Sequence, residues 1–124
     1  MNIQDIKTFI RVYNKLEDVS TKIFQYIKDN YLDQLRFGRY SRYQEFFIIA
    51  NRLYISYYNP ANELGECSYL PSIPIELLET ESSWQQFLDS DFEKRRQKDK
   101  ERKALEKENK ERELYEKLKK KYEV

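Results

Sequence analysis

The chain of 124 residues contains no histidine and only one cysteine, Cys67. The lack of histidine excludes Ser-His-Asp and Cys-His catalytic arrangements, histidine-containing zinc sites and imidazole proton shuttles. A single cysteine forms neither an intrachain disulfide nor a paired-cysteine metal clamp, and it favours a reducing compartment. We therefore expect a cytoplasmic protein that is not an enzyme and holds no metal.

Glycine and long apolar runs are also scarce. The two glycines, Gly38 and Gly65, lie far apart, and neither belongs to a phosphate-binding motif. The first ten residues mix polar with apolar side chains and so lack the uninterrupted apolar run of a signal peptide or a membrane span. These absences predict no nucleotide, no other cofactor and no membrane partner.

Charge and aromatic residues are abundant instead. Charged residues make up 36% of the chain, against about 25% in typical soluble domains. Basic and acidic residues nearly balance, at 23 and 22, and the length suits one domain. We expect a compact α+β core over residues 1–92 and a charged helical extension over residues 93–124.

The first third of the chain predicts a long amphipathic helix over residues 3–35. Asn2 suits the N-cap and Asp5 stands three residues later, as in a capping box. Residues 18–21 leave open one helix or two, of which we favour one, and Gly38 then ends it. The stripe has a spacing of three and four residues and is apolar except at Ser20: Ile3, Ile6, Ile10, Tyr13, Leu16, Ser20, Phe24, Ile27, Tyr31 and Leu35. It is broader than a small sheet covers, which favours a homodimer through this helix.

The middle of the chain, residues 40–70, is rich in aromatic and β-branched residues without helical spacing. Residues 46–50 predict one strand and residues 53–58 a second, joined either by a turn at Asn51-Arg52 or as one bent strand. A loop then leads into a third strand over residues 66–70. The result is a small antiparallel sheet of three strands, followed by a short helical turn over residues 74–79.

The last segment predicts a second long helix. Ser82 or Ser83 suits its N-cap, and the next apolar side chains should dock on the core: Trp84, Phe87, Leu88 and Phe92. Residues 93–121 hold 14 basic and 8 acidic residues and no glycine or proline, so their net charge is +6 and the rest of the chain carries −5. A sparse heptad in this region leaves open a short coiled coil or a single helix stabilised by ion pairs.

The most specific local pattern alternates arginine with aromatic residues over residues 36–43. Arginine pairs with phosphate or carboxylate and aromatic faces stack, so the run suits a nucleic acid or an acidic protein surface. The alternative is that the aromatics seal the corner between helix and sheet. The sheet adds further tyrosines, which are enriched at protein interfaces; the alternative is an amphipathic sheet face of ordinary composition. The candidate partner-binding residues are Arg36, Arg39, Tyr40, Arg42, Tyr43, Tyr54, Tyr57 and Tyr58.

The layout resembles small accessory proteins of phages that infect low-GC Gram-positive bacteria. The resemblance is carried by the run Ile-Pro-Ile-Glu-Leu-Leu at residues 73–78, by the downstream Trp84 and by the Lys/Glu-rich end, and it covers residues 72–124. It implies an uncharacterised phage protein or an inhibitor of bacterial defence, including anti-CRISPR proteins that occupy a nuclease surface without catalysis.

These observations favour a non-enzymatic protein-binding module in the host cytoplasm, a phage-encoded inhibitor of a host protein such as a CRISPR-type defence nuclease. One alternative is a nucleic-acid-binding accessory protein that uses the Arg/Tyr run and the basic tail. The mixing of acids into that tail argues against it, because phosphate binding depends on concentrated positive charge. Another alternative is a homo-oligomeric structural component of the phage.

Overall fold

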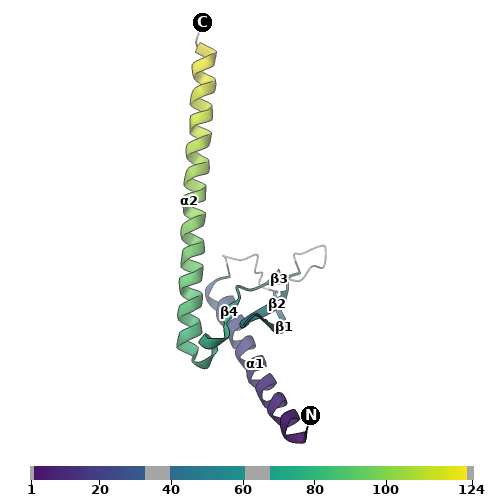
Figure 1. Ribbon diagram of the computed structural model, residues 1–124. Coiled ribbons are helices and arrows are strands. Elements are labelled where there is room, and N and C mark those ends of the chain that lie inside the picture. The colour runs from purple at the N-terminus through teal and green to yellow at the C-terminus, as the bar shows by residue number, and fades with distance from the viewer. Residues whose placement is uncertain (1, 33–39, 61–67, 123–124) are drawn as a thin grey trace. The chain divides into compact units, whose positions relative to one another are not determined.

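The computed structural model describes residues 2–32, 40–60 and 68–122 and has the predicted α+β class. The elements in chain order are α1 (Ile3–Asn30), β1 (Arg42–Ile49), β2 (Arg52–Tyr58), β3 (Ser68–Tyr69), β4 (Ile73–Pro74), the 3-10 helix η1 (Ile75–Glu79) and α2 (Glu81–Tyr122) (Figure 1). The chain forms two compact units, Met1–Asp89 and Ser90–Val124.

Helix α1 begins where the sequence predicts. The Asn2 side chain accepts a hydrogen bond from the Asp5 backbone N–H at 2.8 Å, and the Asp5 carboxylate accepts one from the Asn2 N–H at 3.4 Å. This reciprocal capping box satisfies two N–H groups that a helix start leaves without partners. The helix continues without a break through residues 18–21, so the prediction of one helix is confirmed.

The end of α1 comes five residues earlier than the predicted residue 35. Tyr31 leaves the helical conformation, with φ −132° and ψ 31°, while its N–H still donates to the Ile27 carbonyl at 2.8 Å. The Tyr31 hydroxyl instead donates to Asp89, near the start of α2. The apolar stripe alone could not reveal this tertiary contact. The predicted stop at Gly38 lies outside the described residues.

Strands β1 and β2 form an antiparallel hairpin whose turn is Ala50-Asn51. Both turn residues have positive φ, 50° and 62°, as a tight two-residue hairpin turn requires. The predicted turn at Asn51-Arg52 is therefore wrong by one residue, because Arg52 already pairs with Ile49 in the ladder. A single bent strand is likewise ruled out by this pairing.

Replacement of Ala50 by glycine should stabilise the hairpin. A residue with a Cβ pays about 1–2 kcal/mol in the left-handed region, whereas glycine adopts it freely but loses more entropy on folding. We expect Ala50→Gly to raise the free energy of unfolding by up to about 1 kcal/mol. Thermal unfolding measures this, with Asn51→Gly as the control: asparagine already tolerates positive φ, so that variant should change less. A lower midpoint for Ala50→Gly than for wild type would contradict the assigned turn.

The sheet has four strands rather than the three predicted. Both β3 and β4 pair antiparallel with β2: Tyr69 lies opposite Ser56, and Ile73 lies opposite Leu53. Pro71 stands between these two short strands and lacks an N–H for the ladder, which explains why the edge is broken into two pieces. Directly after β4, helix η1 occupies the predicted short turn.

The core of the first unit lies between α1 and one face of the sheet. Its fully buried apolar residues include Ile23 and Ile27 from α1 together with Leu53 and Ile73 from the sheet. The first turns of α2 add Trp84, whose ring meets that of Tyr26 edge-on at 5.5 Å. Of the side chains predicted to dock, Trp84 and Leu88 are buried in this unit and Phe87 is half-buried; Phe92 belongs to the second unit and is also buried.

Helix α2 begins at Glu81, one residue before the earliest predicted cap. Its capping residue is Thr80, whose hydroxyl oxygen accepts a hydrogen bond from the Ser83 N–H at 3.3 Å. The predicted caps, Ser82 and Ser83, are therefore already inside the helix. An N-cap threonine usually accepts a hydrogen bond from the N–H two or three residues later, and Thr80 does so from Ser83.

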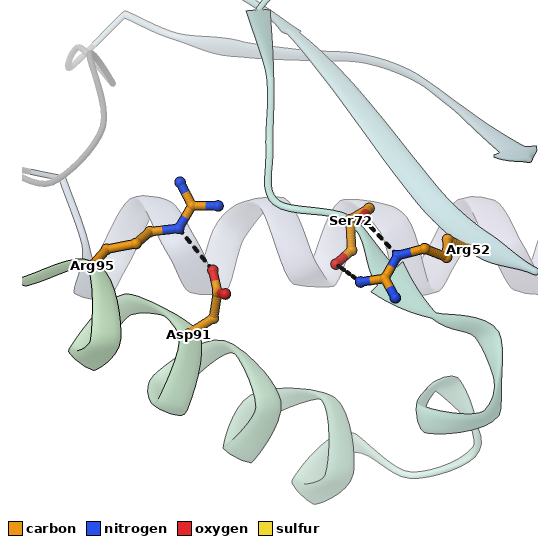
Figure 2. A network of polar contacts seen from close by, with 4 residues as sticks. All are labelled: Arg52, Ser72, Asp91 and Arg95. Carbon is orange, nitrogen blue, oxygen red and sulfur yellow. Dashed lines mark hydrogen bonds and ion pairs between the residues drawn. The ribbon is translucent and has the colours of Figure 1, made fainter. Parts of the chain in front are cut away.

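The second unit consists of the remainder of α2. All of its described residues from Glu93 onward are exposed. Ion pairs one turn apart stabilise it: Arg95 pairs with Asp91 at 2.8 Å (Figure 2), and Arg112 pairs with Glu108 at 3.4 Å. Each such pair contributes about 0.2–0.5 kcal/mol, which agrees with the predicted charged helix.

Candidate protein-binding surface

The register of the β1–β2 hairpin sorts its side chains onto two faces. Tyr43 lies opposite Tyr57, whereas Glu45 lies opposite Ser56, so Gln44 is an extra residue in β1. This irregularity is a β-bulge, and it shifts the alternation of side chains by one position. Residues 43, 46 and 48 of β1 therefore share the inner face, which packs against α1, and residues 42, 45, 47 and 49 share the outer face.

Two of the predicted partner-binding residues, Tyr43 and Tyr57, point to the inner face. The Tyr43 hydroxyl donates to the Glu17 carboxylate on α1 at 2.9 Å. The Phe24 ring lies 6.1 Å from that of Tyr43 and 6.4 Å from that of Tyr57. Tyr57 is only 3% exposed, so it offers no contact area to a partner, and its prediction as a partner-binding residue is wrong. Tyr43 joins β1 to α1 through its contacts with Glu17 and Phe24.

The pKa values of three tyrosines, Tyr26 of α1 and Tyr43 and Tyr57 of the sheet, are raised in the folded chain. Burial, followed by the hydrogen bond to Glu17, raises the pKa of Tyr43 above its ordinary value of 10. Burial, followed by the hydrogen bond to Asp89, likewise raises the pKa of Tyr26. Burial also raises the pKa of Tyr57, against a smaller opposite effect of its hydrogen bond with Ser68.

A tyrosine whose pKa is higher in the folded state than in the unfolded state adds to the free energy of unfolding. The addition is complete at a pH where the same tyrosine is also protonated in the unfolded chain. The contribution is complete below pH 10, and it is lost as the pH rises from 10 through the higher pKa of the folded state. We expect the free energy of unfolding to fall above pH 10, with some tyrosines ionising only as the structure unfolds. Absorbance at alkaline pH, followed together with circular dichroism, measures both. Ionisation of all eleven tyrosines near pH 10 with the fold intact would contradict this.

The outer face of the hairpin carries a cluster of aromatic residues, of which Phe47 and Tyr54 are half-buried and Tyr58 and Tyr69 are exposed. The rings of Phe47 and Tyr54 stack at 5.3 Å with an interplanar angle of 4°, and Tyr69 meets Phe47 edge-on at 5.9 Å. Ile49, Tyr58 and Tyr69 are each more than half exposed. We call these five residues the outer sheet face: Phe47, Ile49, Tyr54, Tyr58 and Tyr69.

Charged side chains of both signs accompany the outer sheet face. Arg42 and Glu45 lie on this side of β1, and both are exposed. Arg52 is held in place by Ser72: its Nε donates to the Ser72 hydroxyl at 2.8 Å and its Nη2 donates to the Ser72 carbonyl at 3.0 Å (Figure 2). A surface with an acid between two arginines is a mixed polar rim rather than the basic stripe that phosphate binding requires.

The structure brings together three of the eight candidate residues. Arg42, Tyr54 and Tyr58 share the outer side of the hairpin. Tyr40 is exposed just before β1, whereas Arg36 and Arg39 lie outside the described residues. The sequence analysis missed three members of the outer sheet face: Phe47, Ile49 and Tyr69. Strand alternation would have identified Phe47 and Ile49, but the continuous apolar run over residues 46–49 shows no polar residue that marks the exposed side.

A second exposed apolar surface lies on the first half of α1. We call it the N-terminal stripe, and its members are between 44% and 73% exposed: Ile3, Ile6, Phe9, Ile10 and Tyr13. A shallow groove of about 700 Å³ has an apolar lining of Val12, Leu16, Val19, Ile48, Ile75 and Leu78 and a charged lining of Lys15, Asp18 and Glu79. This unit therefore exposes apolar area both on the sheet and on the helix.

Comparison of the chain with models of protein families, with curated protein sequences and with solved structures finds no match. Among residues 2–32, 40–60 and 68–122, no group of three or more cysteine, aspartate or glutamate side chains is arranged to hold a metal ion. In the same part of the chain, neither helix has the length and apolar character needed to cross a membrane.

Proposed function

We propose that this protein is a non-enzymatic binding protein that attaches to a partner protein through the outer sheet face. The observation that carries the proposal is the aromatic cluster in which the half-buried, stacked rings of Phe47 and Tyr54 meet the exposed ring of Tyr69. Aromatic residues dominate the binding energy of protein interfaces because they offer a large contact area for few rotatable bonds. The mixed charges around the cluster suit the polar rim of such an interface.

The cluster is already arranged for binding before a partner arrives. Stacking of Phe47 on Tyr54 limits the rotation of both rings, and the hydrogen bonds to Ser72 fix Arg52 beside them. Side chains that are ordered in advance lose little entropy on association, which improves affinity for a given contact area. The strand pairing of β2 on both sides supplies a rigid base for these side chains.

We further propose that the partner is a host protein and that the chain is a phage-encoded inhibitor, for which a CRISPR-type defence nuclease is a fitting target. This part rests on the resemblance of residues 72–124 to accessory proteins of phages. An inhibitor of this kind needs only to occupy a surface of its target. Binding by shape and aromatic contact is sufficient for that task.

The proposal is tested by recovering partners from a lysate of a low-GC Gram-positive bacterium with tagged protein. We expect one protein in equimolar amount, retained after nuclease treatment and at raised salt, because aromatic contacts depend little on ionic strength. Purified protein should show no gel shift with single- or double-stranded nucleic acid at low salt. Recovery of nucleic acid alone, lost steeply with added salt, would instead identify a phosphate-binding protein.

A further inference from the structure

Helix α2 sorts its charges by side, although acidic and basic residues are mixed along the sequence. Five exposed basic residues recur at intervals of four and three, and we call them the basic row: Arg96, Lys100, Lys103, Lys107 and Lys110. At about 100° per residue, these five lie within about 80° of one another around the helix, and no acidic residue of the second unit shares that side. The row is about 21 Å long at 1.5 Å per residue. It therefore presents five positive charges in one direction.

The charges of the basic row are largely not neutralised within the helix. Arg102, which lies on another side of α2, contacts Asp99 at 3.4 Å and Glu106 at 3.9 Å. Arg96 contacts Glu93 at 3.7 Å. Among the residues that the structure describes, none of the four lysines of the row forms an ion pair. Their positive charges are therefore available to an anionic partner.

Carboxylates flank the basic row on both sides. Asp99 and Glu106 lie along one side and Glu111 lies along the other, about 60–80° from the middle of the row. A nucleic-acid duplex is broader than this row, since its major groove alone is about 12 Å wide, and its phosphates would also meet these carboxylates. Single strands are bound through aromatic side chains on which bases stack, and the row contains none. The row therefore suits an anionic partner that is as narrow as itself.

We infer that the basic row binds an acidic helix of a partner protein, whose carboxylates recur at the same intervals of three and four residues. Rows on two helices that lie side by side match in spacing, because both helices rise 1.5 Å per residue. Complementary charges along paired helices determine which partners combine. The flanking carboxylates add to the selection, because they repel a helix that is acidic on all sides.

The occupant is a different protein rather than a second copy of this chain. A two-fold pair of α2 helices that met through the row would place lysine against lysine, and like charges at such positions repel. The row lies in the second unit, whereas the outer sheet face lies in the first. The inference is therefore independent of the proposed function, and either can fail without the other.

Fluorescence anisotropy of the full-length protein with a labelled synthetic helix tests the inference. The probe is a helical peptide of about 20 residues, long enough to span the row, with five glutamates at intervals of four and three and alanine or glutamine elsewhere. We expect saturable binding at low ionic strength that weakens as salt is added, because salt screens exposed ion pairs. A control peptide of the same composition, with its glutamates spread around the helix, should bind at least about tenfold more weakly.

Charge reversal in the protein separates the row from the net charge. The double variant Lys103→Glu and Lys107→Glu reverses two charges in the middle of the row and should weaken binding of the probe at least about tenfold. The double variant Lys98→Glu and Lys120→Glu changes the net charge equally on the other side of α2 and should weaken binding less than about threefold. All four lysines are exposed and glutamate resembles lysine in helix propensity, so circular dichroism should show equal helix content.

Three results would overturn the inference. The first is absence of binding by the probe at low salt. The second is equal binding of the two peptides, or equal loss in the two double variants, since either would show that only net charge matters. The third is a short DNA duplex that binds more tightly than the probe and is lost in the Lys103 and Lys107 variant, which would identify phosphate as the ligand of the row.

Discussion

Replacement of Leu53 by alanine is expected to lower the free energy of unfolding by about 3 kcal/mol. Leu53 is 1% exposed and lies at the centre of the sheet, where β1 pairs with it on one side and β4 on the other. The smaller side chain loses its burial and leaves a cavity between the sheet and α1, because close-packed neighbours relax only partly. Small domains have only about 5–15 kcal/mol in total, so much of the stability would be lost.

Urea unfolding followed by circular dichroism measures this loss. The matched control is Ile49→Ala, in the same hairpin but on the outer sheet face, where Ile49 is 57% exposed. We expect that variant to change the free energy of unfolding by less than about 1 kcal/mol. Equal effects of the two substitutions would contradict the assignment of inner and outer faces.

Replacement of Tyr58 and Tyr69 by lysine is expected to abolish partner binding while the fold persists. Both side chains are more than half exposed, so neither substitution removes a buried group. Each replaces aromatic contact area with a charge that the partner surface must desolvate, and together they should weaken binding at least about 100-fold. The affinity for the recovered partner, measured by calorimetry, gives this ratio directly.

The matched control for that prediction is Tyr115→Lys. Tyr115 is an exposed tyrosine of α2, at 66%, and lies in the second unit. The change of charge and of residue type is the same, so any general effect on solubility or expression is shared. Loss of binding in the control but not in the outer-face variant would move the binding site to the charged helix.

The sequence predicted those parts of the fold that depend on local signals. The start of α1 followed from Asn2 and Asp5, and the continuous charged helix followed from the absence of glycine and proline after residue 93. The end of α1 could not be predicted from a local signal, because the contact of Tyr31 with Asp89 joins residues far apart in the chain. A local pattern contains no information about such a partner.

The candidate surface was only partly predictable for a similar reason. The bulge at Gln44 reverses which residues of β1 face the core, and no proline or glycine marks it in the sequence. Tyr57 and Tyr58 are consecutive residues of β2 and so point to opposite faces, which is why Tyr57 is buried and Tyr58 is 53% exposed. The turn at Ala50 was hidden as well, since alanine is rarely chosen for positive φ.

The most direct test of a protein-binding outer sheet face is photocross-linking inside cells of a low-GC Gram-positive bacterium. A photoreactive amino acid at position 58 should form a covalent link to one protein, and the same amino acid at position 115 should not. Both positions are exposed tyrosines in the free chain, so the comparison reports contact rather than access. A link to nucleic acid at position 58, or equal protein links at both positions, would contradict the account.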